Sequence, residues 1–303
     1  MKQFLFPAIL FLSVVIFSSY KSQAQETQNF SAPDSMSMFN KVDLENVQWY
    51  TIFANIPRDW ERWYDISFRK ERINEWLFIG GLTLATYLTD DITYTPSEKF
   101  YHSSTSAKNL SDFCANIGDG TTQFALAGSF GAYGLVFKNQ KALRTGSQIV
   151  QAVLASGAVI QVLKHITGRE SPFVRTTPLG VWKILPNQID YHRRVPQFDA
   201  YPSGHICTSI ATVIVIAENY PDVKWIRPAG YAFTTIVGLG MLSNGIHWVS
   251  DYPLGLFIGY YFGMLAAHPE GMPIMDSGDG KVKVHVLPNI TPVGTGVKLT
   301  MRF

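Results

Sequence analysis

The sequence predicts an all-α fold, a helical bundle of about six helices with a small C-terminal β-hairpin. Apolar segments of helical length follow one another along the chain, at 76–88, 121–137, 147–163, 205–217, 228–246 and 251–267. Turn-forming residues separate these segments, such as Gly118-Asp119-Gly120 before the second and Pro221 and Pro228 around the fourth connection. Alternating apolar and polar residues, typical of strands, are found in the tail.

The composition narrows the class of protein without deciding it. The chain has 303 residues, of which 47% are hydrophobic and 16% charged, against roughly 25% charged in an ordinary soluble domain. Its mean hydropathy of +0.06 lies between a soluble globule and a multi-spanning membrane protein. The net charge of +2 gives no reason to expect a nucleic-acid partner. Cys114 and Cys207 lack metal-type spacing, and two buried free thiols are favoured over one disulfide.

The first residues have the pattern of a targeting segment. Lys2 precedes an apolar run from Phe4 to about Phe17, and Ser22-Gln23-Ala24 places small residues at a cleavage site. This pattern predicts a signal peptide at 1–24, with an uncleaved membrane anchor as the alternative. Both interpretations place the rest of the chain outside the cytoplasm, in a bacterial-type cell envelope.

Three further regions follow. Residues 25–75 form a polar and aromatic N-terminal arm, which we expect to pack against the core rather than lie at a lipid interface. Residues 76–268 form the helical domain. In the tail, 269–303, the stretches 281–286 and 296–303 alternate and predict two short strands, too few to close a barrel.

Reactive and basic residues gather in three clusters, each at the end of a predicted helix. The first runs from Lys164 to Pro172 and closes the third helix, the second is Pro202-Ser203-Gly204-His205 at the start of the fourth, and the third runs from His247 to Asp251 between the fifth and sixth. Each cluster alone fits an ordinary helix cap or hydrogen bond. Their order and spacing favour a shared site.

The residue types in these clusters suit phosphoryl transfer. His247 and Asp251 are four apart, so on a helical turn the carboxylate can orient the imidazole, which then attacks as a nucleophile. His205 can protonate the leaving oxygen. Lys164 supplies a positive charge, and Ser203 and Gly204 lie at a helix start, where backbone N–H groups bind phosphate. This chemistry needs no metal and no cofactor.

These motifs resemble the type 2 phosphatidic acid phosphatase and vanadium haloperoxidase superfamily over about 120–267. The family signature is K-x6-R-P, then P-S-G-H, then S-R-x5-H-x3-D. Residues 202–205 match the middle motif completely, Lys164 and Pro172 match the ends of the first, and His247 and Asp251 match the third. The resemblance implies a helical phosphatase domain with His247 as nucleophile and Asp251 as its orienting carboxylate.

The sequence departs from this signature at both arginines. Ser171 stands where the first motif has arginine, and Gly240-Met241 stand where the third has Ser-Arg. Arg169, two positions early, can bind the phosphate in their place if the helix ends before Pro172, which Gly168 permits. Other candidates in the long connection before the middle motif are Arg175, Arg193 and Arg194.

We therefore expect a phosphatase acting on a phosphate monoester or diphosphate, with a phospholipid or polyprenyl phosphate as the favoured substrate. Two alternatives stay open: a weak or inactive family member that binds phospholipid head groups, and a vanadate-dependent haloperoxidase. The loop with Lys138, Lys141 and Arg144 lies at the end of the bundle opposite the clusters, which favours a membrane-embedded or membrane-associated protein with its site facing the periplasm.

Overall fold

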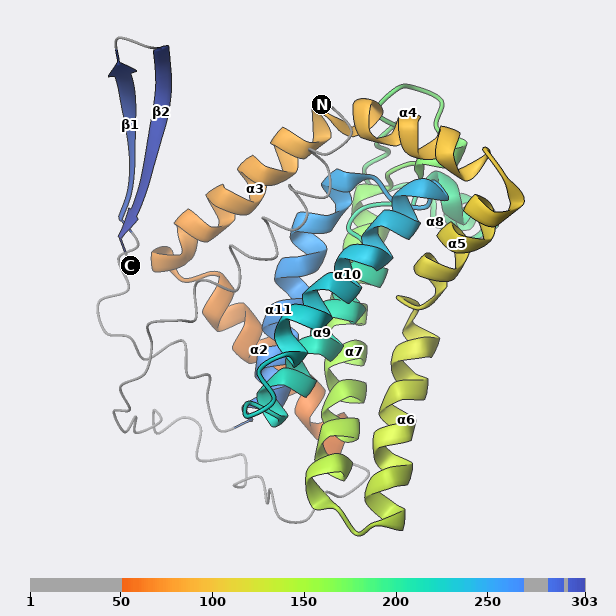
Figure 1. Cartoon of the computed structure of the whole chain (residues 1–303), viewed down its shortest axis with the longest axis vertical. Coiled ribbons are helices and arrows are strands. Elements are labelled where there is room, and N and C mark those ends of the chain that lie inside the picture. Colours follow the sequence, from red (N-terminus) through yellow and green to blue (C-terminus); the bar gives the residue numbers. More distant parts are fainter. Residues whose placement is uncertain (1–50, 270–282, 292–293, 303) are drawn as a thin grey trace.

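The computed structural model describes residues 51–269, 283–291 and 294–302 (Figure 1). Within these residues ten α-helices form: α2 (Thr51–Ser67), α3 (Ile73–Tyr87), α4 (Asp90–Tyr101), α5 (Thr105–Asn116), α6 (Gly120–Val136), α7 (Gln140–Thr167), α8 (Gln188–Arg193), α9 (Gly204–Asn219), α10 (Ile226–Ser243) and α11 (Tyr252–Ala267). Short 3-10 helices lie between them: η3 (Lys70–Arg72), η4 (Pro172–Val174), η5 (Val195–Gln197) and η6 (Val249–Asp251). The predicted helical fold is confirmed. The predicted signal peptide, 1–24, lies outside the described residues.

The six predicted apolar segments correspond to α3, α6, α7, α9, α10 and α11. The helices α2, α4, α5 and α8 were not expected. Proline interrupts the pattern of two of them, Pro57 in α2 and Pro96 in α4, and α8 spans only six residues. Their formation depends on packing against the six apolar helices, which a local pattern does not show.

The core is centred on α9 and α11, which pack against each other and against α7. Helix α11 is buried from Tyr252 to Ala266. Three glycines spaced four apart, Gly255, Gly259 and Gly263, face the backbone of α9, and a Cβ at Gly259 would lie 2.2 Å from the carbonyl oxygen of Cys207. The small side chains let the two helices approach closely.

Helices α6 and α7 form an antiparallel pair that extends away from the rest of the bundle (Figure 1). Asn139 caps α7, its side chain accepting a hydrogen bond from the N–H of Ala142 at 3.0 Å. Among the described helices, α7 alone is long and apolar enough to cross a membrane, and 44% of its most apolar window is buried inside the protein. Membrane embedding therefore stays a prediction.

Helix α2, part of the predicted arm, packs against α7 and α11. Its Asp59 is fully buried and accepts a hydrogen bond from Gln151 of α7 at 2.5 Å. Asn55 donates to the same glutamine at 3.1 Å. A buried polar network thus joins this segment to the bundle.

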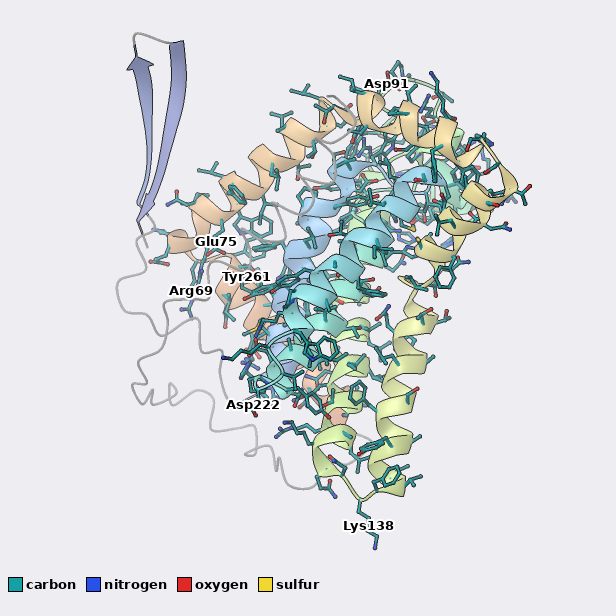
Figure 2. The ribbon with its side chains drawn as sticks, in the orientation of Figure 1. Arg69, Glu75, Asp91, Lys138, Asp222 and Tyr261 are labelled. Atoms are coloured by element: carbon teal, nitrogen blue, oxygen red, sulfur yellow. The ribbon has the colours of Figure 1, made fainter. Side chains whose placement is uncertain are left out.

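The two ends of the bundle differ. Helix α4 passes over one end, where its Glu98 lies 3.4 Å from Arg175 of the long connection before α9, and the α6–α7 turn forms the other end (Figure 1). Figure 2 shows Lys138 at the tip of that turn and Asp91 of α4 at the opposite end. The basic loop and the three clusters therefore lie at opposite ends, as the sequence predicted.

Strands β1 (Lys283–Thr291) and β2 (Gly294–Arg302) pair antiparallel, with Lys283 opposite Arg302. Residues 270–282, which join them to α11, lie outside the described residues. The predicted hairpin is therefore not supported as part of the helical domain, and the fold class depends on the helices alone.

Candidate active site

Each of the three clusters lies where a helix begins or ends, and a glycine or a capping serine marks that point. Helix α7 ends at Gly168, which takes the left-handed conformation (φ 53°) and donates its N–H to the carbonyl of Lys164 at 3.1 Å. Helix α10 ends just before Gly245, also left-handed (φ 78°). Helix α9 begins after Ser203, whose side chain accepts the N–H of Ile206. The three ends meet on one side of the bundle.

The imidazoles of His205 and His247 lie next to each other. Their ring centroids are 5.8 Å apart and the ring planes make an angle of 67°. The side chain of His205 is 26% exposed and that of His247 is 1% exposed. One ring is therefore open to an incoming molecule, and the other forms the buried wall behind it.

The hydrogen bonds of His247 define its reactive nitrogen. Its Nδ1 lies 2.7 Å from the carbonyl oxygen of Ala200. A carbonyl only accepts hydrogen bonds, so Nδ1 carries the proton and Nε2 has a free lone pair. Nε2 is buried and has no hydrogen-bond partner. The ring is thus held in the tautomer that an attacking nucleophile needs.

Both imidazoles are neutral at pH 7. Burial lowers the pKa of His247 to about 3, with a further decrease from the nearby Lys164, while Asp199 and the Ala200 carbonyl act in the opposite direction. Burial likewise lowers the pKa of His205, with further decreases from His247 and Lys164, and Asp119 opposes this. A neutral His247 is the nucleophilic form.

His247 and Asp251 are in contact as predicted, but the hydrogen bond of the His247 Nδ1 goes to another acceptor. The carboxylate Oδ2 accepts the backbone N–H of Trp248 at 2.7 Å and lies 3.4 Å from Nδ1 of His247. The shorter bond of that nitrogen goes to Ala200. Trp248 is extended (ψ 159°), so His247 precedes η6 and does not share a helical turn with Asp251. The backbone carbonyl orients the ring, and Asp251 acts as a nearby charge.

The prediction that Arg169 binds phosphate is also wrong in this structure. Its side chain is fully buried, with Nη1 2.5 Å from Oδ1 of Asp251 and Nη2 2.7 Å from Oδ2 of Asp90. Its guanidinium lies against the rings of Tyr87, Trp182 and Trp248. The helix does end at Gly168 as expected, but the chain then turns Arg169 toward the carboxylates rather than toward the imidazoles.

The other candidate arginines lie elsewhere. Arg175 is 3.4 Å from Glu98 and lies over the ring of Tyr94, and Arg194 is 3.5 Å from Asp190 in an exposed pair. Arg193 is exposed on α8. Ser171 and Met241, which stand at the two positions where the family motifs have arginine, are both buried.

Lys164, in the last turn of α7, is a cation whose charge acts on both imidazoles. It is 6% exposed, and its Nζ lies 3.5 Å from Oδ2 of Asp199. It lowers the pKa of both histidines, which shows its electrostatic reach into the site. Its role at the phosphate stays a prediction.

Two acidic residues of the site were not among the sequence candidates. Asp199 faces Lys164, and Asp119 has its Oδ2 3.6 Å from Nε2 of His205. Asp119 also caps α6 through Thr121, and the backbone and hydroxyl of that threonine lower its pKa. The Gly-Asp-Gly turn marked it as a cap, but only the fold brings that cap to His205.

Ser203 and Gly204 form the predicted helix start. Ser203 is fully buried, its hydroxyl caps Ile206, and its N–H donates to the carbonyl of Asp251 at 2.9 Å. The hydroxyl is therefore engaged, and the groups left for an anion are the first backbone N–H groups of α9. In the described part of the chain, no group of three His, Cys, Asp or Glu gathers at metal-binding distance.

The fold and the site define an all-helical protein in which two neighbouring imidazoles and a lysine gather at helix ends. Residues 146–270 match the family described as the PAP2 superfamily. This match confirms the predicted resemblance and supports a phosphatase-type activity at a coarse level. Searches of curated proteins and of solved structures found no match.

Proposed function

We propose that this protein hydrolyses a phosphate monoester or diphosphate through a phosphohistidine intermediate, and that the phosphate is carried by a lipid. The observation that carries the proposal is the buried, unpartnered Nε2 of His247 beside the ring of His205. A buried nitrogen without a hydrogen-bond partner costs free energy. A catalytic role explains why such a nitrogen is kept in this site.

In the first step, Nε2 of His247 attacks phosphorus. The N–P bond forms as the bond from phosphorus to the leaving oxygen breaks, and His205, protonated in the substrate complex, donates its proton to that oxygen. In the second step, His205 takes a proton from water, the hydroxide attacks phosphorus, and the N–P bond breaks. Inorganic phosphate leaves, and both imidazoles return to their starting state.

Substrate binding lets His205 take up from the solvent the proton that it later donates. The empty site lowers the pKa of His205, as described above. A phosphate dianion placed between the rings raises this pKa, because a nearby opposite charge favours the charged imidazole. Lys164 and the N–H groups of α9 then stabilise the non-bridging oxygens.

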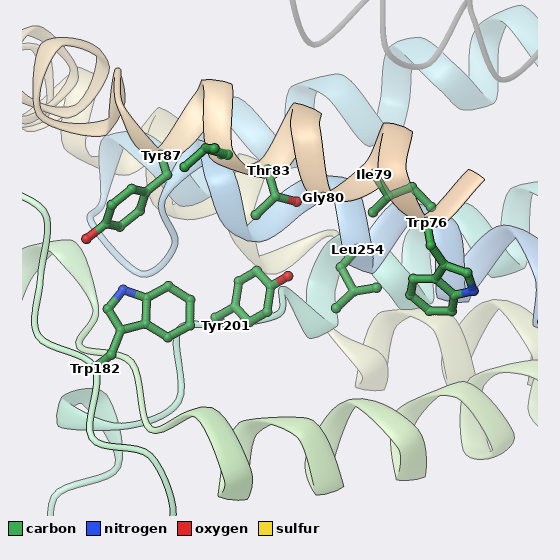
Figure 3. A pocket seen from close by; sticks show the side chains of 9 residues that line it. Trp76, Ile79, Gly80, Thr83, Tyr87, Trp182, Tyr201 and Leu254 are labelled. Carbon is green, nitrogen blue, oxygen red and sulfur yellow. The ribbon is translucent and has the colours of Figure 1, made fainter. Parts of the chain in front are cut away.

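An apolar groove beside the site supports a lipid substrate. The groove has a volume of about 400 Å³, within the usual range of ligand sites. In Figure 3, side chains of α3 face others from the connection before α9 and from α11 across the groove, which is lined by Trp76, Ile79, Gly80, Thr83, Leu84, Tyr87, Trp182, Tyr201 and Leu254. Tyr201 adjoins Ala200, whose carbonyl holds His247. A hydrocarbon chain is the occupant that suits this lining.

The proposed setting is a bacterial-type cell envelope, with the site on the periplasmic side. The predicted signal peptide supports it, and so does the basic loop with Lys138 at the far end of the bundle (Figure 2).

The test is release of inorganic phosphate by the purified protein from phosphatidate and polyprenyl phosphate vesicles. Acid-stable and acid-labile phosphoprotein are measured after mixing with labelled substrate, since a phosphohistidine is lost in acid. We expect labelling in the wild type and none in His247→Asn, with turnover reduced by about 10³-fold or more. Unchanged turnover in His247→Asn would reject the mechanism.

A second candidate function is binding of a phosphate head group without turnover. The weak anion pocket favours it, because Lys164 faces Asp199 and no arginine occupies the family positions. Each charged hydrogen bond lost at a phosphate costs about 1.5–3 kcal/mol. Vesicle binding that His247→Asn leaves intact, with no phosphate released from a broad substrate panel, would favour this candidate.

A further inference from the structure

Asp90, the first residue of α4, contributes to the wall behind His247, although it lies outside the family-matched segment. Its side chain is fully buried. Its Oδ2 lies 2.7 Å from Nη2 of Arg169 and accepts the hydroxyl of Ser250 at 2.5 Å, and its Oδ1 accepts the N–H of Ser250 at 3.1 Å. A residue distant in sequence is therefore built into the loop that carries the nucleophile.

The bonds of Arg169 explain what Asp90 does to Asp251. One guanidinium is shared between two carboxylates, so the three side chains carry one positive and two negative charges, a net charge of −1. Without Asp90, Arg169 and Asp251 would form a neutral pair. The carboxylate of Asp251 lies 3.4 Å from Nδ1 of His247, so the surplus negative charge lies next to that ring.

The phosphohistidine needs such a charge. With a phosphoryl group on Nε2 and a proton on Nδ1, the imidazole ring is formally positive. The Ala200 carbonyl offers only a dipole to this ring. In a buried, low-dielectric wall, an unbalanced carboxylate stabilises the cation more strongly than a neutral ion pair would.

We propose that Asp90 is a positioning residue for the phosphoryl transfer: it fixes Arg169 and Ser250 and keeps a net negative charge behind His247. The inference rests on the proposed function. Asp90 acts through Arg169 and Asp251 and does not touch the substrate. The packing of α4 supports it, since Tyr94 lies edge-on against Trp248 with ring centroids 5.6 Å apart.

The surrounding charges give the role a measurable signature. Burial raises the pKa of both Asp90 and Asp251 to about 6, opposed by Arg169. Lowering the pH below about 6 therefore protonates Asp90 or Asp251, removes the net negative charge that they carry together with Arg169, and lowers kcat. The other charged or titratable groups that influence it are Lys164 on α7, Tyr201 before α9 and Tyr252 on α11. Burial keeps both tyrosines neutral.

The experiment compares the pH dependence of kcat in the wild type with that of Asp90→Asn, Asp90→Glu and Ser250→Ala in the full chain. In Asp90→Asn we expect kcat to fall by about 10-fold to 100-fold with KM within about threefold. The fall of kcat on the acid side of the pH profile should move to lower pH. Without the like charge of Asp90, Asp251 pairs with Arg169 alone and its pKa decreases. Asp90→Glu should recover part of kcat and keep the acid side of the wild-type profile.

Ser250→Ala is the matched control, because it removes a hydrogen bond to Asp90 without changing the charge. That hydrogen bond lowers the pKa of Asp90, so its loss should leave the acid side of the kcat profile in place or move it to higher pH, never to lower pH. Circular dichroism and thermal melting confirm that each variant is folded. An acid side that does not move in folded Asp90→Asn, or an equal shift to lower pH in Ser250→Ala, would overturn the inference and leave the proposed function intact. A wild type that releases no phosphate would overturn both.

Discussion

The apolar groove offers a prediction with an internal control, because α3 carries two adjacent glycines with different surroundings. Gly80 lines the groove and Gly81 does not. A Cβ built at either position meets nothing within 4 Å, so neither substitution collides with the protein. Replacing each in turn by leucine adds the same side chain to the same helix, inside the groove in one variant and outside it in the other.

The size of the effect follows from the hydrocarbon that the new side chain displaces. Leucine adds four carbons to a groove of about 400 Å³. Each buried methylene contributes about 0.8 kcal/mol. Displacing four from the groove therefore costs up to about 3 kcal/mol, or roughly 200-fold in kcat/KM at about 1.36 kcal/mol per tenfold. If the leucine displaces only part of the hydrocarbon, the decrease in kcat/KM is smaller, about 10-fold.

The assay measures kcat/KM for phosphatidates of increasing chain length and for a short, water-soluble phosphate monoester. Gly80→Leu should lose activity on the long-chain substrates and keep it on the short one, and Gly81→Leu should keep both. Both variants should gain a similar stability from helix propensity. Equal losses in the two variants, or a loss by Gly80→Leu on the short substrate as well, would refute the assignment of the groove.

Three further predictions concern charge and packing. Asp199→Asn should strengthen competitive inhibition by inorganic phosphate several-fold, because it frees Lys164 from its ion-pair partner. Lys164→Ala should weaken this inhibition. Equal inhibition constants in the two variants would argue against this phosphate pocket. Burial raises the pKa of Asp59 to about 6, above its value of 3.8 when exposed, so the folded state binds the extra proton. The free energy of unfolding should therefore gain roughly 1–3 kcal/mol as the pH falls from 7 to 4, and Asp59→Asn should lack that gain in denaturant titrations. Gly259→Ala should lower the melting temperature because its Cβ would collide with the backbone of α9, whereas Gly128→Ala, which meets nothing, should not.

Much of the bundle could be predicted because its apolar helices have a local signal. The segments 205–217 and 251–267 are apolar almost throughout, and they became the buried helices α9 and α11. Helix α4 was missed because its sequence is polar and contains Pro96. Its helical form depends on a surface that exists only once the other helices have assembled.

The candidate site divides in a similar way. The motif spacing placed His205, His247 and Lys164 at helix ends, and the structure brings them together. The role expected for Arg169 failed because counting along a helix does not tell where a side chain points after the helix has ended. The hydrogen bond expected from His247 to Asp251 goes to the carbonyl of Ala200 instead, because the extended Trp248 takes His247 out of the helical turn, although the two side chains still lie 3.4 Å apart.

The sequence by itself determined the all-helical class, the resemblance to the superfamily and the identity of the two imidazoles, because these depend on residue type and spacing along one chain. The tertiary structure decided which acceptor orients His247, which charges surround it and where Arg169 goes. Those outcomes depend on distances between residues far apart in the chain, such as Asp90 and Asp251, and on the burial that makes each unpaired charge costly.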